Sequence, residues 1–220
     1  MDWYKFESLL NTRSLYLCRA DRLEDRFEGT YSRRQLVDME QWIEKVTDSD
    51  EVLNEREARA RDRLRTYINC WCVGDTDFDL MWKGYVRKSP GVAVKSTVAA
   101  LERACDEAIE KWPLDISLVN YFDHAGGQWI DYFGTPSIFF WKDLHFSLEN
   151  EIRIVHWPNI ADSPPENVWL PVQLDVLIEA VVMSPKATEE CAAAAKQLLE
   201  RSGLKQVPVL YSRDDRNVYV

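Results

Sequence analysis

The sequence predicts an α+β fold in a single domain, with a mixed, bent β-sheet flanked by helices. Short runs with a period of two residues, typical of strands, are interspersed with longer stretches of helical periodicity. The 220 residues are 46% hydrophobic and include only 8 Gly and 9 Pro, the composition of a folded globular protein. A chain of this length buries roughly 70% of its unfolded surface, so its stability requires neither a metal nor a disulfide.

The first third of the chain begins with a helix and a strand. Apolar residues between positions 3 and 10 recur at helical spacing, and residues 14–18 read as a strand. A charged loop over 19–29 ends at a glycine, and a charged helical insertion occupies about 32–66. The Asp-Ser-Asp sequence at 48–50 predicts a break in this helical insertion. The alternating charges of the insertion are typical of solvated helix faces.

The remaining elements follow from the same periodicities. Strands are predicted at 67–73, 91–95, 116–122, 146–155, 168–174, 180–183 and 207–211. Helices are predicted at 77–86, 97–113 and 188–202. Thr97 can cap the second of these helices and Pro113 ends it, while Gly203 follows the alanine-rich third helix.

The charge and the apolar runs bear on partners and location. Lys and Arg total 27 against 37 Asp and Glu, a net charge of −10, which disfavours a broad surface for duplex DNA. The longest apolar runs fall far short of the ~20 residues that a membrane span needs. The N-terminal residues also lack the pattern of a signal peptide. We therefore expect a cytoplasmic protein that is not embedded in a membrane.

The five cysteines predict free thiols. An odd number of cysteines in a cytosolic chain is typical of reduced thiols. Cys70 and Cys72 are separated by one residue, without the spacing or the second pair of ligands that a zinc site needs. We interpret them as ordinary strand residues and expect no metal site.

The segment 146–155 carries the most distinctive pattern of polar residues. If it is a strand, Glu149, Glu151 and Arg153 share one face. The other face is then apolar: Leu148, Ile152 and Ile154. The polar face is either a solvated outer face or the floor of a site, and the sequence leaves both interpretations open.

Several motifs occur together along the chain. They are 14–21 (Ser-Leu-Tyr-Leu-Cys-Arg-Ala-Asp), 25–29 (Asp-Arg-Phe-Glu-Gly), 70–71 (Cys-Trp), 81–85 (Met-Trp-Lys-Gly-Tyr), 91–94 (Gly-Val-Ala-Val), 96–97 (Ser-Thr), 146–153 (Phe-Ser-Leu-Glu-Asn-Glu-Ile-Arg) and 181–185 (Val-Val-Met-Ser-Pro). In this order, and over nearly the whole chain, the set resembles the bacterial domain-of-unknown-function family 2971. The chain lacks the family's usual N-terminal aromatic-basic strand. It also has Arg26 in place of a proline and Cys72 in place of a frequent histidine.

The Glu-x-Glu pair is similar to the catalytic strand of arginine-directed ADP-ribosyltransferases. By this analogy, Glu151 would stabilise the positive charge that develops on the nicotinamide ribose of NAD, and Glu149 would position the nucleophile. Arg153 would keep both carboxylates ionised. The cofactor would then be NAD.

Further residues are candidates for binding a nucleotide beside this pair. They are Arg153, Arg19, Asp21, Glu28, Trp82, Lys83 and Tyr85. The loop residues among them are equally explained by a salt-bridged loop, and helical spacing favours core packing of Trp82 and Tyr85. His145 precedes the polar strand and could reach its carboxylates as an acid or base, although a surface histidine is the simpler interpretation.

Three function hypotheses remain from the sequence. The first is a bacterial defence- or toxin-type effector, active in phage defence or stress, with a nucleotide pocket and chemistry resembling ADP-ribosyl transfer. The second is a non-catalytic module that binds a partner protein through exposed aromatic residues. The third is a Mg²⁺-dependent nuclease, which requires Asp21, Glu28, Glu149 and Glu151 to converge.

Overall fold

The protein is described by a computed structural model that covers most of the chain. The described residues are 1–25, 27–46, 50–74, 79–87, 90–127, 129–130, 136–158 and 164–212. Contacts divide the chain into two compact units. The first unit contains residues 1–15, 74–111 and 169–220, and the second contains residues 16–73 and 112–168. No helix among the described residues is long and apolar enough to span a membrane.

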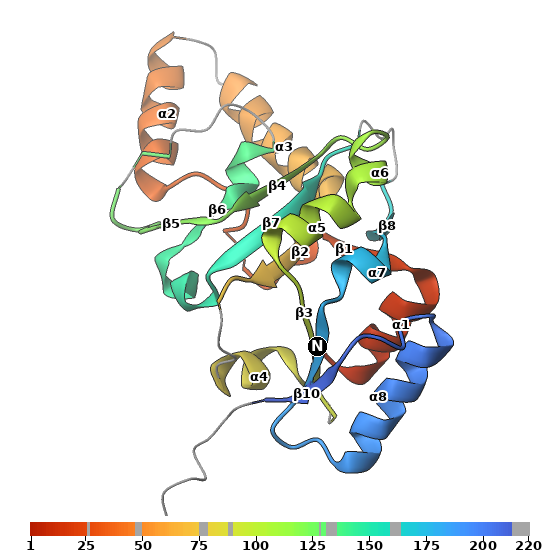
Figure 1. The fold of residues 1–220 in the computed structure, drawn as a ribbon. Coiled ribbons are helices and arrows are strands. Elements are labelled where there is room, and N and C mark those ends of the chain that lie inside the picture. The colour runs from red at the N-terminus through yellow and green to blue at the C-terminus, as the bar shows by residue number, and fades with distance from the viewer. Residues whose placement is uncertain are drawn as a thin grey trace, which may run out of the picture. The chain divides into compact units, whose positions relative to one another are not determined.

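The predicted α+β class is confirmed (Figure 1). The largest sheet has the strand order β4-β7-β2-β1-β8. Its strands are β1 (Ser14–Arg19), β2 (Tyr67–Cys72), β4 (Leu114–Leu118), β7 (Glu151–His156) and β8 (Asn167–Pro171). Strand β7 pairs antiparallel with both β2 and β4, so it lies inside the sheet and all six of its residues are buried.

The register of β7 decides which residues share a face of this sheet. Cys70 and Ser117 lie opposite Arg153 on the two neighbouring strands, and Cys72 lies opposite Glu151. Residues that face each other across antiparallel strands project to the same side. Arg153 therefore lies at the centre of one sheet face, next to Glu151 on its own strand.

The predicted strand at 146–155 begins later than expected. Residues Leu144–Glu149 form the 3₁₀ helix η3, and Asn150 adopts a left-handed conformation with φ 40° before β7 begins at Glu151. Leu148, expected on the apolar inner face, is 74% exposed. The prediction that Glu149 belongs to the strand was wrong because a turn of the backbone, not strand alternation, carries it towards Glu151.

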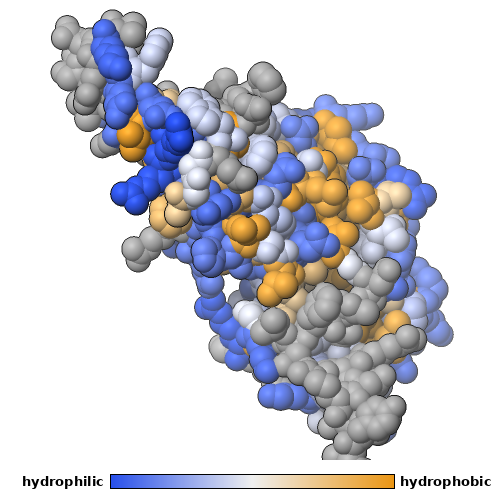
Figure 2. All heavy atoms as spheres, turned by 90° about the vertical axis from the view of Figure 1, so that its left-hand side faces the viewer, coloured by the Kyte–Doolittle hydropathy of each residue, from blue (hydrophilic) through white to orange (hydrophobic). Residues whose placement is uncertain are grey.

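Helices and short strands complete the second unit. The charged insertion forms α2 (Arg33–Val46) and α3 (Asp50–Arg65). Of the predicted break at 48–50, residues 48 and 49 lie outside the described residues, and Asp50 begins α3. Ser32 and Gln35 form a capping box at the start of α2, in which each side chain accepts a hydrogen bond from the other residue's backbone N–H. Hydrophilic residues cover much of the surface in Figure 2, but α2 also exposes the apolar side chains of Leu36, Val37 and Trp42.

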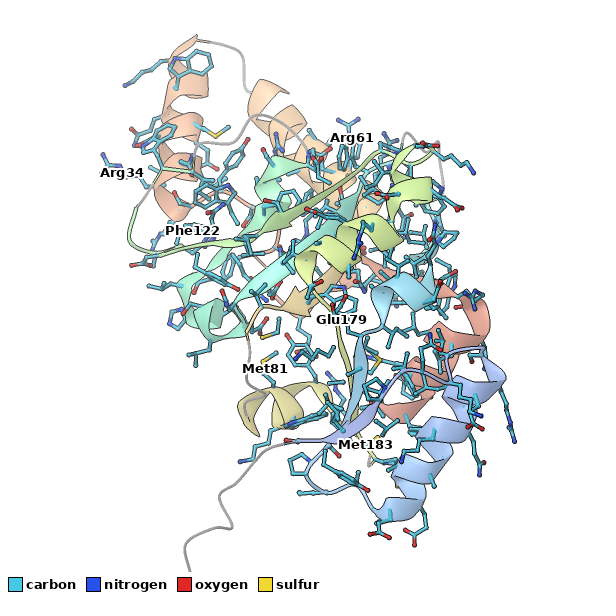
Figure 3. All side chains as sticks on the ribbon, in the orientation of Figure 1. Arg34, Arg61, Met81, Phe122, Glu179 and Met183 are labelled. Atoms are coloured by element: carbon cyan, nitrogen blue, oxygen red, sulfur yellow. The ribbon has the colours of Figure 1, made fainter. Side chains whose placement is uncertain are left out.

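The predicted strand at 116–122 is two strands. Strand β4 ends at Leu118, and the Val119 N–H donates to the Glu151 carbonyl. Strand β5 (Asn120–Phe122) then pairs in parallel with β6 (Trp141–Asp143), an element absent from the prediction. Phe122, labelled in Figure 3, lies with its ring centroid 6.1 Å from that of Trp141. The 3₁₀ helices η1 (Ala20–Arg22) and η2 (Ser137–Phe140) contribute to a buried cluster that includes Ala20, Tyr31, Ile68, Phe139 and Val155.

The first unit has a three-stranded sheet of order β10-β9-β3. Strand β9 (Ala180–Met183) pairs antiparallel with β3 (Val92–Lys95) and parallel with β10 (Val209–Tyr211). The helices of the first unit are α1 (Trp3–Thr12), α4 (Asp79–Tyr85), α5 (Val98–Ala104), α6 (Asp106–Ile109), α7 (Leu174–Leu177) and α8 (Glu189–Arg201). Met81 on α4 and Met183 on β9 are labelled in Figure 3.

Two predicted elements of the first unit require correction. The helix expected at 97–113 divides at Cys105, whose N–H donates to the Glu102 carbonyl in a tighter turn. The strand expected at 168–174 ends at Pro171, and Leu174 begins α7. Thr97 caps α5 as predicted, since its hydroxyl accepts a hydrogen bond from the Ala100 N–H at 3.2 Å.

Candidate functional site

Arg153 is the largest fully buried side chain of the second unit. Its Nε donates to Glu151 Oε2 at 2.6 Å, and its two terminal nitrogens donate to the two carboxylate oxygens of Glu28. One of these nitrogens also donates to the Phe139 carbonyl at 2.6 Å. The planar guanidinium thus binds both oxygens of Glu28 while its Nε binds Glu151, a fixed fork of donors that a lysine ammonium does not have.

Glu28 reaches Arg153 from a tight turn. The Asp25 carboxylate accepts a hydrogen bond from the Phe27 N–H at 2.8 Å, and the Glu28 N–H donates to the Asp25 carbonyl. Gly29 follows with φ 68°, and a Cβ at this position would lie 2.3 Å from the Phe139 ring. The turn therefore needs glycine for its conformation and for its close approach to Phe139. The turn and the ion pair with Arg153 thus explain the Glu-Gly sequence at 28–29 without a ligand.

Lys142 extends the arrangement on the other side of Glu151. Its ammonium donates to Glu151 Oε1 at 2.6 Å and to Glu149 Oε2 at 2.8 Å. The same ammonium lies 4.5 Å from the centroid of the Phe146 ring. The side chains of Glu28, Arg153, Glu151, Lys142 and Glu149 therefore form a series of alternating charges, which we call the charge chain.

The two carboxylates at the Lys142 end have opposite pKa shifts. Burial alone would raise the pKa of Glu151, but its hydrogen bond with Glu149 and the charges of Arg153 and Lys142 hold this pKa well below its ordinary value. Burial and the hydrogen bond with Glu151 raise the pKa of Glu149, against the attraction of Lys142. As the pH falls, Glu149 is therefore the first of the two to take up a proton, while Glu151 stays ionised.

Access also differs between the two carboxylates. Both oxygens of Glu151 accept hydrogen bonds from cationic groups, and its side chain is 2% exposed. The side chain of Glu149 is 22% exposed. Carboxylates whose environments separate their pKa values are typical of acid–base sites, with the accessible member in contact with substrate.

The structure brings together four of the predicted site residues: Glu28, Glu149, Glu151 and Arg153. Arg19 and Asp21 form a different pair, in which Arg19 Nε donates to Asp21 Oδ1 at 2.6 Å. Arg19 also donates to the Pro164 carbonyl at 2.9 Å. Their interactions match the predicted alternative of a salt-bridged loop.

The other three predicted binding residues lie on α4 of the first unit. Trp82 is buried, whereas Lys83 and Tyr85 are exposed. Their participation in a site with the charge chain stays a prediction.

His145 does not occupy the position expected of an acid or base for the two glutamates. Its ring is 90% exposed and contacts the Asp143 carboxylate, which raises the pKa of His145. The simpler interpretation, a surface histidine, is therefore confirmed: His145 lies in η3, where its ring contacts Asp143 and not the two glutamates.

Lys142 and Tyr121 were not predicted from the sequence as site residues. The Tyr121 hydroxyl accepts a hydrogen bond from the Glu151 N–H at 2.9 Å. The only available signal for Lys142 was a single charged residue directly after the apolar run 138–141. A charged residue in such a place needs a partner when it is buried, but the sequence does not say which.

The described part of the chain contains no convergent set of metal ligands. No group of three or more His, Cys, Asp or Glu side chains there has an arrangement that could hold a metal ion. The carboxylates required by the nuclease hypothesis are divided between two places, since Asp21 pairs with Arg19 and Glu28 with Arg153. The five cysteines are free thiols.

Comparisons with known proteins do not extend these observations. No family model matches the chain, and no curated protein or solved structure matches it significantly. The resemblance to family 2971 therefore stays a prediction.

Proposed function

We propose that this protein transfers an ADP-ribosyl group from NAD⁺ to an acceptor, with Glu149 as the group that acts on the substrate. The observation that supports this proposal most directly is the pairing of a partly exposed Glu149 with a buried, ionised Glu151. The proposal exchanges the roles expected from the sequence. Glu151 becomes the internal support, because both of its oxygens are already engaged.

Glu149 would act as a general base in this reaction. The bond between C1′ of the ribose and the nicotinamide nitrogen breaks, and its electron pair leaves with nicotinamide. A lone pair of the acceptor forms the new bond to C1′, and the acceptor's proton moves to a carboxylate oxygen of Glu149. The raised pKa makes the ionised carboxylate of Glu149 a stronger base than an ordinary glutamate.

The wider parts of the proposal rest on the sequence. A cytoplasmic effector in phage defence or a stress response is the role that we propose from the family resemblance.

The test is NAD⁺ consumption and protein-bound ADP-ribose, measured with purified wild type and Glu149→Gln. We expect the substitution to lower the rate about 100-fold or more, the usual contribution of a general base. Asp115→Asn is the matched control, because it removes one carboxylate from an exposed position of the neighbouring strand β4. It should keep the wild-type rate.

Two results would contradict the proposal. One is a folded wild type that neither consumes NAD⁺ nor binds it. The other is a Glu149→Gln variant that is folded and as active as Asp115→Asn. Either result excludes ADP-ribosyl transfer by Glu149.

Exposed aromatic residues support a second candidate, a protein-binding module. In the second unit Phe27, Trp42 and Trp129 are 56%, 62% and 59% exposed. Figure 2 shows hydrophobic residues exposed between hydrophilic ones on one side of the molecule. Aromatic side chains are enriched at protein interfaces. Retention of a specific partner by wild type but not by Trp129→Ser would support this alternative.

A further inference from the structure

The proposed function gives no role to Lys142. This residue comes from β6, which is fixed by its parallel pairing with β5 and places Tyr121 opposite Lys142. Tyr121 in turn accepts the hydrogen bond from the first N–H of β7. Through Tyr121, the backbone position of Lys142 on β6 is therefore connected to Glu151, the first residue of β7.

The ammonium of Lys142 lies between two carboxylates that would otherwise repel each other. Glu149 and Glu151 are separated by a single residue, and the left-handed Asn150 turns one towards the other. The distances of 2.8 Å and 2.6 Å from Lys142 Nζ are those of two charge-assisted hydrogen bonds. One cation thus keeps the two anions together at the partly exposed end of the charge chain.

Building on the proposed role of Glu149, we infer that Lys142 is a positioning residue. Its ammonium fixes the Glu149 carboxylate beside Glu151 and sets the pH at which Glu149 takes up a proton. Arg153 is shared between Glu28 and Glu151, so Lys142 supplies the second cation for these two buried carboxylates, and for that purpose its contact with Glu151 would suffice. The second contact, to the partly exposed Glu149, connects Lys142 to the group that meets substrate.

The experiment is a direct titration of Glu149, observed by ¹³C NMR of the glutamate carboxyl carbons and assigned with Glu149→Gln. In Lys142→Met, the lost positive charge should raise the Glu149 midpoint by about one to three pH units. Lys142→Arg retains the charge and should show a smaller change. Lys45→Met is the matched control, because Lys45 is exposed on α2 of the same unit. It should leave the midpoint unchanged.

A second measurement uses the unaltered Lys142 and so does not depend on the folding of Lys142→Met. The ¹⁵Nζ signal of Lys142 should shift with pH at the same midpoint as Glu149, and this shift should disappear in Glu149→Gln. An equal Glu149 midpoint in folded Lys142→Met and wild type would overturn the inference. A Lys142 signal that does not respond to the titration of Glu149 would overturn it as well.

These titrations need neither NAD⁺ nor turnover. Coupled titration in an inactive wild type would support the role of Lys142 and reject the proposed reaction. An active wild type without coupled titration would reject only the role of Lys142.

Discussion

At the scale of single residues, Arg153 decides the character of the second unit. It is a fully buried cation that forms ion pairs with two buried carboxylates, Glu28 and Glu151. A buried pair of this kind adds little compared with well-packed apolar residues, but removal of one partner leaves an uncompensated charge. The main consequence of losing Arg153 would therefore be that Glu28 and Glu151 are left buried without their shared cation.

We expect Arg153→Met to destabilise the protein by about 3–5 kcal/mol, because Glu28 and Glu151 would lose their shared counterion inside the fold. Arg34→Met is the control: Arg34, labelled in Figure 3, pairs with Asp38 at the surface of α2. Such an exposed pair contributes about 0.5 kcal/mol or less. Urea unfolding of both variants measures the difference. Equal losses would show that the Arg153 pairs are not buried in solution.

At the scale of elements, the start of β7 depends on one backbone conformation. Asn150 has φ 40°, and its side-chain amide donates to the Val73 carbonyl. Asparagine tolerates this left-handed conformation better than most residues. The turn directs Glu149 towards Glu151 and so allows both to contact Lys142.

A comparison of Asn150→Ala with Asn150→Gly isolates this conformation. Both substitutions remove the hydrogen bond to Val73, but only alanine carries the Cβ that disfavours a positive φ. We expect the alanine variant to be less stable than the glycine variant by about 1–2 kcal/mol in urea unfolding. Equal stability of the two variants would mean that Asn150 leaves the left-handed region in solution.

At the scale of the whole molecule, buried histidines connect stability to pH. Burial lowers the pKa of His156, against its hydrogen bond to the Pro113 carbonyl. The unfolded chain then takes up a proton near the ordinary value of 6.5 while the folded protein does not. The contribution of His156 to stability is therefore present above this pH and lost as the pH falls through it. The contribution of the exposed His145 to stability has the opposite pH dependence, because Asp143 raises its pKa. This contribution is present at low pH and is lost as the pH rises through the raised pKa.

We expect the stability difference between wild type and His156→Gln to shrink by up to about 1 kcal/mol when the pH falls from about 7.5 to about 5.5. For His145→Gln the difference should instead grow. Urea unfolding of the three proteins at both pH values measures these changes. The comparison between variants removes the effect of the net charge of −10, which all proteins share apart from the histidine. The same trend for both histidines would contradict the assignment.

The α+β class and most helices and strands could be predicted from the sequence, because apolar periodicity and caps such as Thr97 act over a few neighbouring residues. The sequence also placed Glu151 and Arg153 on one face, since alternate residues of a strand share a side. Only the tertiary structure decided what covers that face. Glu28 and Lys142 reach it from other parts of the chain.

Alternation tells which side chains share a face but not whether water or protein lies over it. The burial of Arg153 follows from the turn at Gly29 and from η2, which no pattern within 146–155 contains. The left-handed Asn150 likewise interrupts a segment that reads as a continuous strand. These features depend on contacts between distant residues, so the sequence predicted the pair of carboxylates and the tertiary structure decided which of them is accessible.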